Sequence, residues 1–238
     1  MSATIKQVPS ALSVDELKLT YGHLEGKDLL RAMIGEVFPG RIGLVSSFGS
    51  ESAVLLEMVA EIEPTLPILF LNTGKLFGET LRYRDLMQGR FGFTDIRSLE
   101  PPEDELQAED KNGLLWTRNL DACCELRKTR PLEQALGDFD AWVTGRKRFQ
   151  SDGRAGLPLI EESAGKIKVN PLVNWGFEAL QAYANEKNLP RHPLVADGYL
   201  SIGCVPCTRR VAPGETYRSG RWSSTDKTEC GIHIGDNI

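Results

Sequence analysis

The residues best suited to chemistry in this sequence are its five cysteines, four of which form two close pairs. The stretch DACCELRK holds Cys123 and Cys124, and GCVPCTRR holds Cys204 and Cys207 in a Cys-x-x-Cys spacing. Four thiolates in two pairs satisfy either a tetrahedral zinc ion or an iron–sulfur cluster. Adjacent cysteines on a helix point about 100° apart, which suits a multi-metal cluster better than a single ion. The alternative is two buried cysteines together with a redox Cys-x-x-Cys pair.

The fifth cysteine, Cys230, lies in the closing stretch TECGIHIGDNI, three residues before His233. A thiol so near a chain end has little core to pack against, so its reactivity is the better reason for its presence. Lys128 follows Cys124 by four residues, which places both on the same face of a helix. We therefore predict a reactive thiol at Cys230 and a positive charge at Lys128 beside the paired cysteines and any bound anion.

Basic side chains gather in two short stretches of a chain whose formal net charge is −5. The acidic balance argues against non-specific binding to nucleic acid, whereas clustered arginines favour a compact anionic ligand held by forked guanidinium groups. For any single arginine, solvated surface charge remains the alternative. The clusters are TGRKRFQSDGR, with Arg146, Lys147, Arg148 and Arg154, and CTRRVAPGETYRSGR, with Arg209, Arg210, Arg218 and Arg221.

Short β-rich runs alternate with helical patterns along the chain, and these elements must position the reactive residues. Their order predicts an α/β fold, a mostly parallel sheet with helices on both faces. The expected strands cover residues 41–47, 66–72, 93–99 and 140–145, and the expected helices cover residues 51–63, 78–90 and 175–189.

Two loops follow the first two expected strands, at the edge where an open α/β sheet binds its ligands. SSFGSES, residues 46–52, opens a helix, and its hydroxyl groups and glycine let backbone N–H groups approach a phosphate or a sugar. LNTG, residues 71–74, forms a tight turn suited to an adenine or ribose edge. Neither loop ends in Gly-Lys-Ser/Thr, which disfavours ordinary P-loop phosphoryl transfer. A simple turn remains the alternative for each.

The composition is that of a globular protein, with 238 residues of which 41% are hydrophobic. The first residues contain no apolar run of signal-peptide length, and the longest apolar run is far too short to span a bilayer. We therefore expect a cytoplasmic protein without membrane association. We expect an α/β nucleotide-binding domain over residues 1–208, which includes the paired cysteines, and a mobile C-terminal tail over residues 209–238, which carries Cys230.

The motifs together resemble the sulfonucleotide reductases. SSFGSES, LNTG, CCELRK, WVTGRKRFQS, GCVPCTR, YRSGRW and ECGIH stand in the order found in that family, from about residue 40 to residue 234. In the family, the paired cysteines mark the assimilatory adenosine 5′-phosphosulfate (APS) reductases, which carry a [4Fe-4S] cluster. The branch that uses 3′-phosphoadenosine 5′-phosphosulfate (PAPS) typically lacks them. The resemblance implies an adenine-nucleotide α-hydrolase-like (PP-loop-like) fold and the reduction of APS to sulfite and AMP, in sulfate assimilation and cysteine biosynthesis.

The same resemblance implies the roles of individual residues. Cys230 attacks the sulfur of APS, expels AMP and becomes S-sulfocysteine, from which thioredoxin or glutaredoxin releases sulfite; Lys128 and His233 are the other catalytic residues. The implied cluster ligands are Cys123, Cys124, Cys204 and Cys207. The implied substrate-binding residues are Ser46, Ser47, Phe48, Gly49, Leu71, Asn72, Thr73, Gly74, Gly145, Lys147, Arg148, Arg154, Arg218 and Arg221.

Three positions depart from the family's pattern. Asn72 stands where the family usually has Asp, and Arg154 falls one place early, in a stretch where Phe149 replaces an acid. The basic loop at residues 146–154 leaves PAPS, or both nucleotides, as alternative substrates. From other classes, a zinc-binding module suits the four cysteines, and a PP-loop ATP pyrophosphatase suits the fold but calls for a loop closer to Ser-Gly-Gly-x-Asp-Ser. The end at ECGIH implies a separate protein reductant, and a homo-oligomer stays open.

Overall fold

A computed structural model describes residues 12–223, 225 and 227–233. In these residues the chain forms one six-stranded sheet in the order β3-β2-β1-β4-β6-β5. Strand β5 runs antiparallel to β6 and the other neighbouring pairs are parallel, which confirms the predicted mostly parallel sheet. The strands are β1 (Ile42–Ser46), β2 (Ile68–Leu71), β3 (Ile96–Leu99), β4 (Ala141–Val143), β5 (Ile160–Ser163) and β6 (Lys166–Val169).

The central strands β1, β2 and β4 are buried along their whole length. Their apolar runs are typical of parallel strands that are covered on both faces. Leu44 of β1 pairs with Ile68 on one side and with Val143 on the other. The chain builds outward from β1 through β2 to β3 and then returns to place β4 on the opposite side of β1. The sheet therefore has its switch point between β1 and β4, where open α/β sheets bind their ligands.

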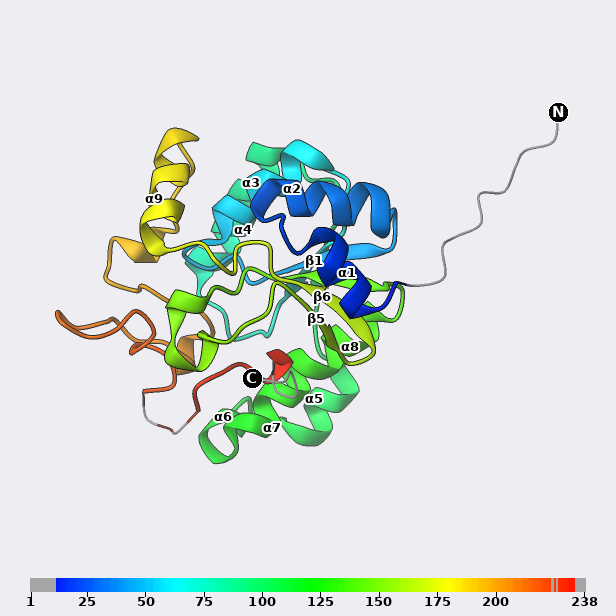
Figure 1. The fold of residues 1–238 in the computed structure, drawn as a ribbon. Helices are drawn as coiled ribbons and strands as arrows, with labels where there is room; N and C mark the ends of the chain where they lie inside the picture. Colours follow the sequence, from blue (N-terminus) through cyan, green and yellow to red (C-terminus); the bar gives the residue numbers. More distant parts are fainter. Residues whose placement is uncertain (1–11, 224, 226, 234–238) are drawn as a thin grey trace.

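Helices cover both faces of the sheet (Figure 1). On one face a large core packs around Leu56 and Phe70, and on the other a smaller core joins Leu132 and Leu136 to Trp142. The first layer contains α1 (Val14–Tyr21), α2 (Gly26–Arg31), α3 (Ser52–Ile62), α4 (Gly78–Phe91) and α9 (Phe177–Glu186). The second contains α8 (Arg130–Leu136), with α5 (Glu103–Glu109), α6 (Leu115–Arg118) and α7 (Leu120–Cys124) beside it.

Helix α7 continues into α8 through a π-helical turn, Glu125–Thr129. Arg127 in this turn is buried and forms an ion pair with Asp110, with 2.7 Å between Nη2 and Oδ2. Its Nη1 also donates a hydrogen bond of 2.7 Å to the carbonyl oxygen of Thr73, in the loop after β2. The buried guanidinium thus ties the helix that carries the paired cysteines to the second predicted ligand loop.

The hairpin of β5 and β6 was not among the predicted strands. Its turn residues, Ala164 and Gly165, both have positive φ, at 52° and 71°, as a two-residue hairpin turn requires. Half of the residues of IEESAGKIKV are polar, and the run lies at one side of the sheet, so it lacks the continuous apolar pattern by which a buried strand is found.

The described part of the C-terminal segment folds back onto the sheet and α7. Isolated bridges join Leu76 to Cys204 and Thr208 to Arg221. A 3₁₀ turn, Gly231–His233, packs against the π-helical turn, and a Cβ added at Gly231 would lie 3.1 Å from Thr129 Oγ1. This packing brings Cys230 to the carboxyl edge of the parallel strands. The domain boundary at residue 208 stays a prediction.

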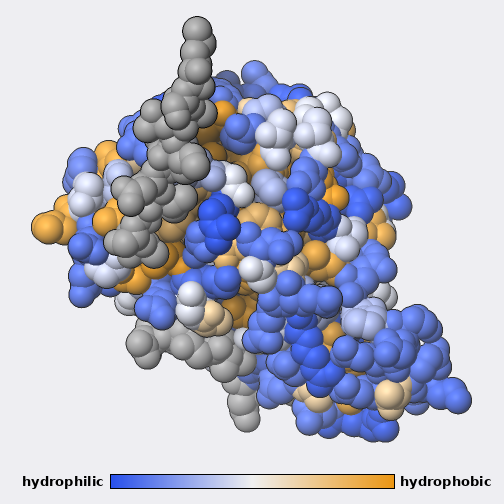
Figure 2. Space-filling model, turned by 90° about the vertical axis from the view of Figure 1, so that its right-hand side faces the viewer, coloured by the Kyte–Doolittle hydropathy of each residue, from blue (hydrophilic) through white to orange (hydrophobic). Residues whose placement is uncertain are grey.

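Hydrophobic and hydrophilic side chains are interspersed on the face of the molecule shown in Figure 2. Within the described residues, no helix combines the length and apolar character needed to cross a bilayer.

Candidate active site

A cavity of about 210 Å³ opens at the carboxyl ends of β1, β2 and β4, beside the switch point of the sheet. Both predicted loops and the C-terminal segment reach it, although they lie far apart in the sequence. Phe48, Asn72, Gly74 and Arg148 are not among the residues that line it. The predicted residues that do line it are Ser46, Ser47, Gly49, Leu71, Thr73, Lys128, Gly145, Lys147, Arg154, Arg218, Arg221, Cys230 and His233.

Phe48 shapes the loop after β1 and does not face the cavity. Its side chain is fully buried and meets Phe70 edge-on, with 5.4 Å between the ring centroids. Its φ of 48° is unusual for a bulky residue and is held here by this packing. The Phe48 N–H also donates to Ser46 Oγ at 3.2 Å. With the ring anchored in the core, Ser47 and Gly49 face the cavity just before α3 begins.

In the loop after β2, alternate residues point to different surroundings. Leu71 and Thr73 line the cavity, whereas the Asn72 side chain donates a hydrogen bond of 2.7 Å to Glu100. Gly74 makes the turn with φ of 67°, a conformation that glycine adopts without strain. Because Asn72 lies outside the cavity, its replacement of the family's Asp leaves the charge of the cavity lining unchanged.

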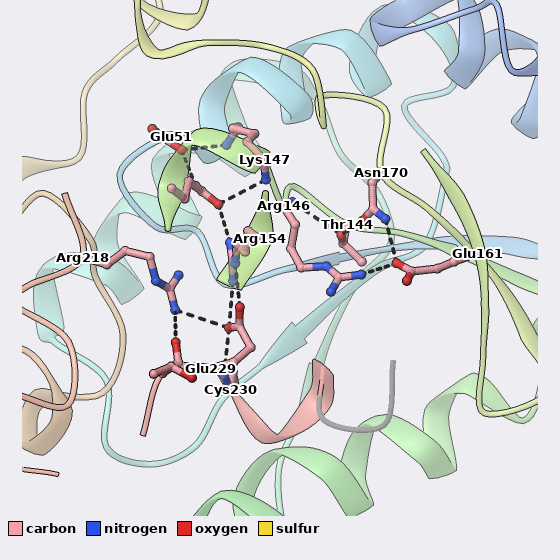
Figure 3. Close-up of polar contacts among 12 residues, drawn as sticks. Glu51, Thr144, Arg146, Lys147, Arg154, Glu161, Asn170, Arg218, Glu229 and Cys230 are labelled. Carbon is pink, nitrogen blue, oxygen red and sulfur yellow. Dashed lines mark hydrogen bonds and ion pairs between the residues drawn. The ribbon is translucent and has the colours of Figure 1, made fainter. Parts of the chain in front are cut away.

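The predicted basic loop divides between the cavity and the surface. Lys147 is buried and forms an ion pair with Glu51, with 2.7 Å between Nζ and Oε2, and Gln150 donates to the same oxygen (Figure 3). Arg148 instead turns away, and its Nη1 donates to Asn174 at 2.6 Å. Lys147 therefore lies at the cavity, where it can contact a ligand. Arg148 lies outside the cavity, and its hydrogen bond to Asn174 stabilises the loop.

Glu229, the neighbour of Cys230, joins two arginines of the cavity (Figure 3). Both of its oxygens accept from Arg154, at 2.6 and 2.8 Å, and Oε1 also accepts from Arg218 at 3.3 Å. Burial opposes its ionisation, but the two guanidinium groups bring the pKa of Glu229 down to about 2. Burial and the nearby charge of Arg154 lower the pKa of Arg218 to about 10, although Glu229 opposes this shift. The three groups therefore carry a net positive charge at neutral pH.

Lys128 Nζ lies 3.7 Å from the Sγ atom of Cys230, so the structure brings together two of the predicted catalytic residues. Burial alone would raise the pKa of this thiol, but Lys128, the Ile232 N–H group and Arg221 bring the pKa of Cys230 below its ordinary value. Burial would likewise lower the pKa of Lys128, but the neighbouring thiolates raise it. A thiolate beside an ammonium group is the reactive form of a cysteine nucleophile.

Arg218 and Arg221 both lie against the ring of Trp222. Their guanidinium carbons are 5.3 and 4.4 Å from its ring centroid, within the range of cation–π contacts. Arg221 also donates from Nε to the carbonyl oxygen of Cys207 at 3.3 Å. A Cβ at Gly203 would lie only 2.4 Å from the Arg221 guanidinium, so a side chain here would push the guanidinium out of its place. The two arginines are thus held in place before any ligand arrives.

His233 is buried and stacks on Trp142, with 6.2 Å between the ring centroids and 8° between the planes. Burial, together with the positive charges of Arg146 and Lys168, holds the pKa of His233 well below its ordinary value. The ring is therefore neutral near pH 7.

The four paired cysteines line a second, smaller cavity next to the first. Burial and the neighbouring thiolates raise the pKa of Cys123 and Cys207 to about 11 each. Cys204 borders both cavities, and its sulfur lies 3.3 Å from the Thr73 hydroxyl. Among the described residues, no three Cys, His, Asp or Glu side chains form a cage for a single metal ion. The four predicted ligands nevertheless line one common cavity.

Several cavity residues were absent from the predicted site. Glu51 and Glu229 lie inside the motifs SSFGSES and ECGIH, but a carboxylate is not a residue type that an anion-binding site suggests. Trp222 also lines the cavity and directly follows Arg221 in the sequence. Arg146 forms a buried ion pair with Glu161, a residue of the unpredicted hairpin (Figure 3). The other cavity residues outside the prediction include Ser50, Gln150, Ser201, Ile202, Gly203 and Tyr217.

Comparison with known proteins agrees with this arrangement. Residues 41–210 match the phosphoadenosine phosphosulfate reductase domain family. A protein of Mesorhizobium japonicum named adenosine 5′-phosphosulfate reductase is 50% identical over 92% of this chain and 86% of its own length. A protein of the same name from Chelativorans sp. is 43% identical over 98% of this chain and 96% of its own length.

Solved structures show the same fold. A phosphoadenylyl-sulfate (PAPS) reductase from Candida auris, in a phosphate complex, superposes with a TM-score of 0.69 at 30% identity, over 84% of this chain and 100% of that one. Yeast FAD synthetase, at 16% identity and a TM-score of 0.55 over 83% of this chain and 74% of its own, shares the fold alone. These neighbours confirm the predicted PP-loop-like fold, and the domain match together with the close relatives shows that this chain belongs to the phosphoadenosine phosphosulfate reductase domain family.

Proposed function

We propose that this protein reduces adenosine 5′-phosphosulfate to sulfite and AMP, as a step of sulfate assimilation and cysteine biosynthesis. The observation that carries the proposal is the 3.7 Å contact between Lys128 and Cys230, in a cavity lined by two strand-end loops and by buried arginines. A charge-stabilised thiolate in a site built for an anionic nucleotide fits attack on an activated sulfate. The names of the close relatives support the same substrate.

In this proposal the two loops hold the nucleoside and the basic groups hold the phosphosulfate. Ser47 and Gly49 precede the amino end of α3, where free backbone N–H groups favour an anion. Arg154, Arg218 and Arg221 supply guanidinium groups whose forked donors match phosphate and sulfate oxygens. Their fixed positions around the reacting bond also stabilise the charge that develops as the bond breaks.

The first chemical step transfers a sulfonate group to the enzyme. The Cys230 thiolate forms a bond to the sulfate sulfur, and the bond between this sulfur and the bridging oxygen breaks. The electron pair of the broken bond leaves with AMP, and Cys230 becomes S-sulfocysteine. Lys128 stabilises the thiolate before attack. His233, whose imidazole is neutral, borders the same cavity. We propose that it takes part in this step together with Cys230 and Lys128.

The second step needs a dithiol reductant, which we propose to be thioredoxin or glutaredoxin. One reductant thiolate attacks the Cys230 sulfur and expels sulfite, which leaves a mixed disulfide. The second reductant thiol then resolves this disulfide and restores the Cys230 thiol, so the reductant is oxidised as the sulfur is reduced. All five cysteines are free thiols in the structure, as suits the reducing cytoplasm in which we place the protein.

The four paired cysteines fit a [4Fe-4S] cluster in number and type and line one cavity, and we propose that they hold one. Burial, together with the charge of the neighbouring thiolates, raises the pKa of Cys123 and of Cys207. Arg127 and Lys128 border the same space and offset that negative charge, and the Thr73 hydroxyl contacts the Cys204 sulfur. A bound cluster would supply structural tethering and a local electrostatic field.

Sulfite release from APS and from PAPS, at matched concentrations with thioredoxin present, tests the proposed activity. We expect sulfite from APS. Sulfite from PAPS as well would identify a dual reductase, and sulfite from PAPS alone would contradict the substrate assignment. Stoichiometric zinc and no sulfite from either nucleotide would favour the zinc-binding module. A protein without metal that releases pyrophosphate from ATP would favour the PP-loop pyrophosphatase.

A further inference from the structure

Glu229 places a carboxylate where the proposed substrate should place its anionic groups. The carboxylate is held bidentately by Arg154 and is also in contact with Arg218, and all three side chains line the cavity. Their side chains are 7%, 13% and 12% exposed for Arg154, Arg218 and Glu229, so the contact lies inside the protein. The carboxylate thus occupies the fork of Arg154 and one donor of Arg218, which a sulfate or phosphate would use.

The same carboxylate is also tied to the nucleophile. Its Oε1 accepts a hydrogen bond of 2.8 Å from the backbone N–H of Cys230, the next residue along the chain. The Cys230 thiol in turn lies beside Lys128. If the Glu229 carboxylate leaves the arginines, this hydrogen bond is also broken, and the backbone at Cys230 loses one of its restraints.

We propose that Glu229 acts as an internal stand-in for the phosphosulfate: it occupies Arg154 and Arg218 in the nucleotide-free enzyme, keeps Cys230 against Lys128, and is displaced from the arginines by the substrate. The inference rests on the proposed function for the identity of the substrate. A phosphosulfate carries two negative charges against the single charge of the carboxylate, so it matches the arginine pair better. Glu229 is then a positioning residue and a competitor for the substrate site, and it takes no part in the bond changes.

Two measurable effects follow from this competition. The apparent affinity for nucleotide is reduced, because part of the binding free energy is spent in displacing the carboxylate. The Cys230 thiol is also shielded while no nucleotide is bound, since the ion pair holds its backbone against the sheet edge. Removing the negative charge without changing the side-chain shape, as in Glu229→Gln, should weaken both effects.

The first test measures alkylation of Cys230 by iodoacetamide in the nucleotide-free protein, by mass spectrometry of the peptide that contains it, and compares rates at the high-pH plateau, where the thiol is fully ionised, because the charge of Glu229 also raises the pKa of Cys230. We expect Glu229→Gln to speed the reaction at least threefold. Glu215→Gln is the matched control, because Glu215 pairs bidentately with Arg209 at 2.8 Å but is not among the residues that line the cavity.

The second test measures binding of APS by calorimetry in a Cys230→Ser background, where no sulfonate transfer can occur. Adding Glu229→Gln should tighten binding at least threefold. Alkylation at the wild-type rate, or weaker binding of APS, would overturn the proposal. If Cys230→Ser alone fails to bind APS, the proposed function fails, and the alkylation rates still decide whether Glu229 restrains Cys230.

Discussion

The Nζ atom of Lys128 and the Sγ atom of Cys230 lie 3.7 Å apart, although one residue belongs to the helical turn after the Cys-Cys pair and the other to the C-terminal segment. The contact joins the proposed cluster site to the proposed nucleophile. It exists because the π-helical turn directs Lys128 into the main cavity and the 3₁₀ turn at Gly231–His233 packs against that turn.

Removing the ammonium group of Lys128 should slow sulfonate transfer to Cys230. We expect Lys128→Met to reduce the rate of AMP release in a single turnover by roughly ten- to a hundredfold, the loss typical of one charge-assisted hydrogen bond. Lys187, which is paired with Glu61 on the surface, provides the control variant Lys187→Met. A Lys128→Met protein that transfers sulfonate at the wild-type rate would remove Lys128 from the proposed site.

The arginines beside Trp222 should contribute to substrate use separately. Changing Arg218 or Arg221 to Ala should lower kcat/KM by roughly ten- to a hundredfold, and Lys should not restore it fully because it lacks the planar fork. Arg209→Ala is the control, since Arg209 pairs with Glu215 at the surface. Steady-state kinetics with APS measures the effect, and unchanged values in both cavity variants would place these arginines outside the substrate site. AMP should compete more weakly than APS binds, because it lacks the sulfate.

The paired cysteines should bind iron. Protein purified without oxygen should be brown and contain about four irons and four acid-labile sulfides per chain. Cys204→Ser or Cys124→Ser should abolish the colour and most of the activity. Each should also lower the melting temperature, because the ligands come from segments far apart in the chain and metal binding couples to folding. Colourless protein with full activity would refute the cluster.

His192 should make the fold sensitive to acid. Its ring is buried beside Tyr83, its Nδ1 accepts from the Leu194 N–H at 3.2 Å, and its Nε2 lies 3.1 Å from Thr80 Oγ1. Burial lowers the pKa of His192 to about 4, with Glu79 partly opposing the shift. The ring stays neutral in the folded protein but protonates near pH 6.5 in the unfolded chain. Its contribution to the free energy of unfolding is therefore fully present above about pH 6.5. This contribution, on the order of 2–3 kcal/mol, is lost as the pH falls toward 4.

The free energy of unfolding, measured by denaturant titration between pH 7.5 and pH 4.5, checks this prediction (roughly the window set by the two pKa values). His192→Gln should reduce the dependence on pH, whereas His23→Gln, at an exposed position, should not change it. An equal dependence in wild type and His192→Gln would assign the acid sensitivity to other groups.

The sequence was sufficient to predict the central elements of the fold. The four expected strands correspond to β1 to β4. Short β-rich apolar runs, such as the one around the buried Leu44, are typical of buried strands and could be recognised in the sequence. Helices α3, α4 and α9 fall within one to three residues of the expected ranges. The hairpin of β5 and β6 was missed because half of its residues are polar and its strands pair at one side of the sheet.

The site was predictable in its parts and not in its contacts. Motif order placed Cys230, Lys128 and the arginines together, but residue type alone did not reveal that Phe48 turns into the core or that Arg148 faces the surface. Glu229 was passed over for the same reason: a carboxylate inside an anion site makes sense only once its two arginine partners are seen. Such pairings depend on tertiary packing, which local patterns do not record.

The most direct test of the proposed function is one turnover of the wild-type protein with APS and no thioredoxin. We predict release of about one AMP per site and a mass increase of about 80 Da on the peptide that contains Cys230, the arrested covalent intermediate of a two-step reaction. Cys230→Ser should give neither AMP nor adduct while keeping its cluster. An adduct on any of the other four cysteines, or sulfite release by Cys230→Ser with thioredoxin, would contradict the assignment of Cys230 as the nucleophile.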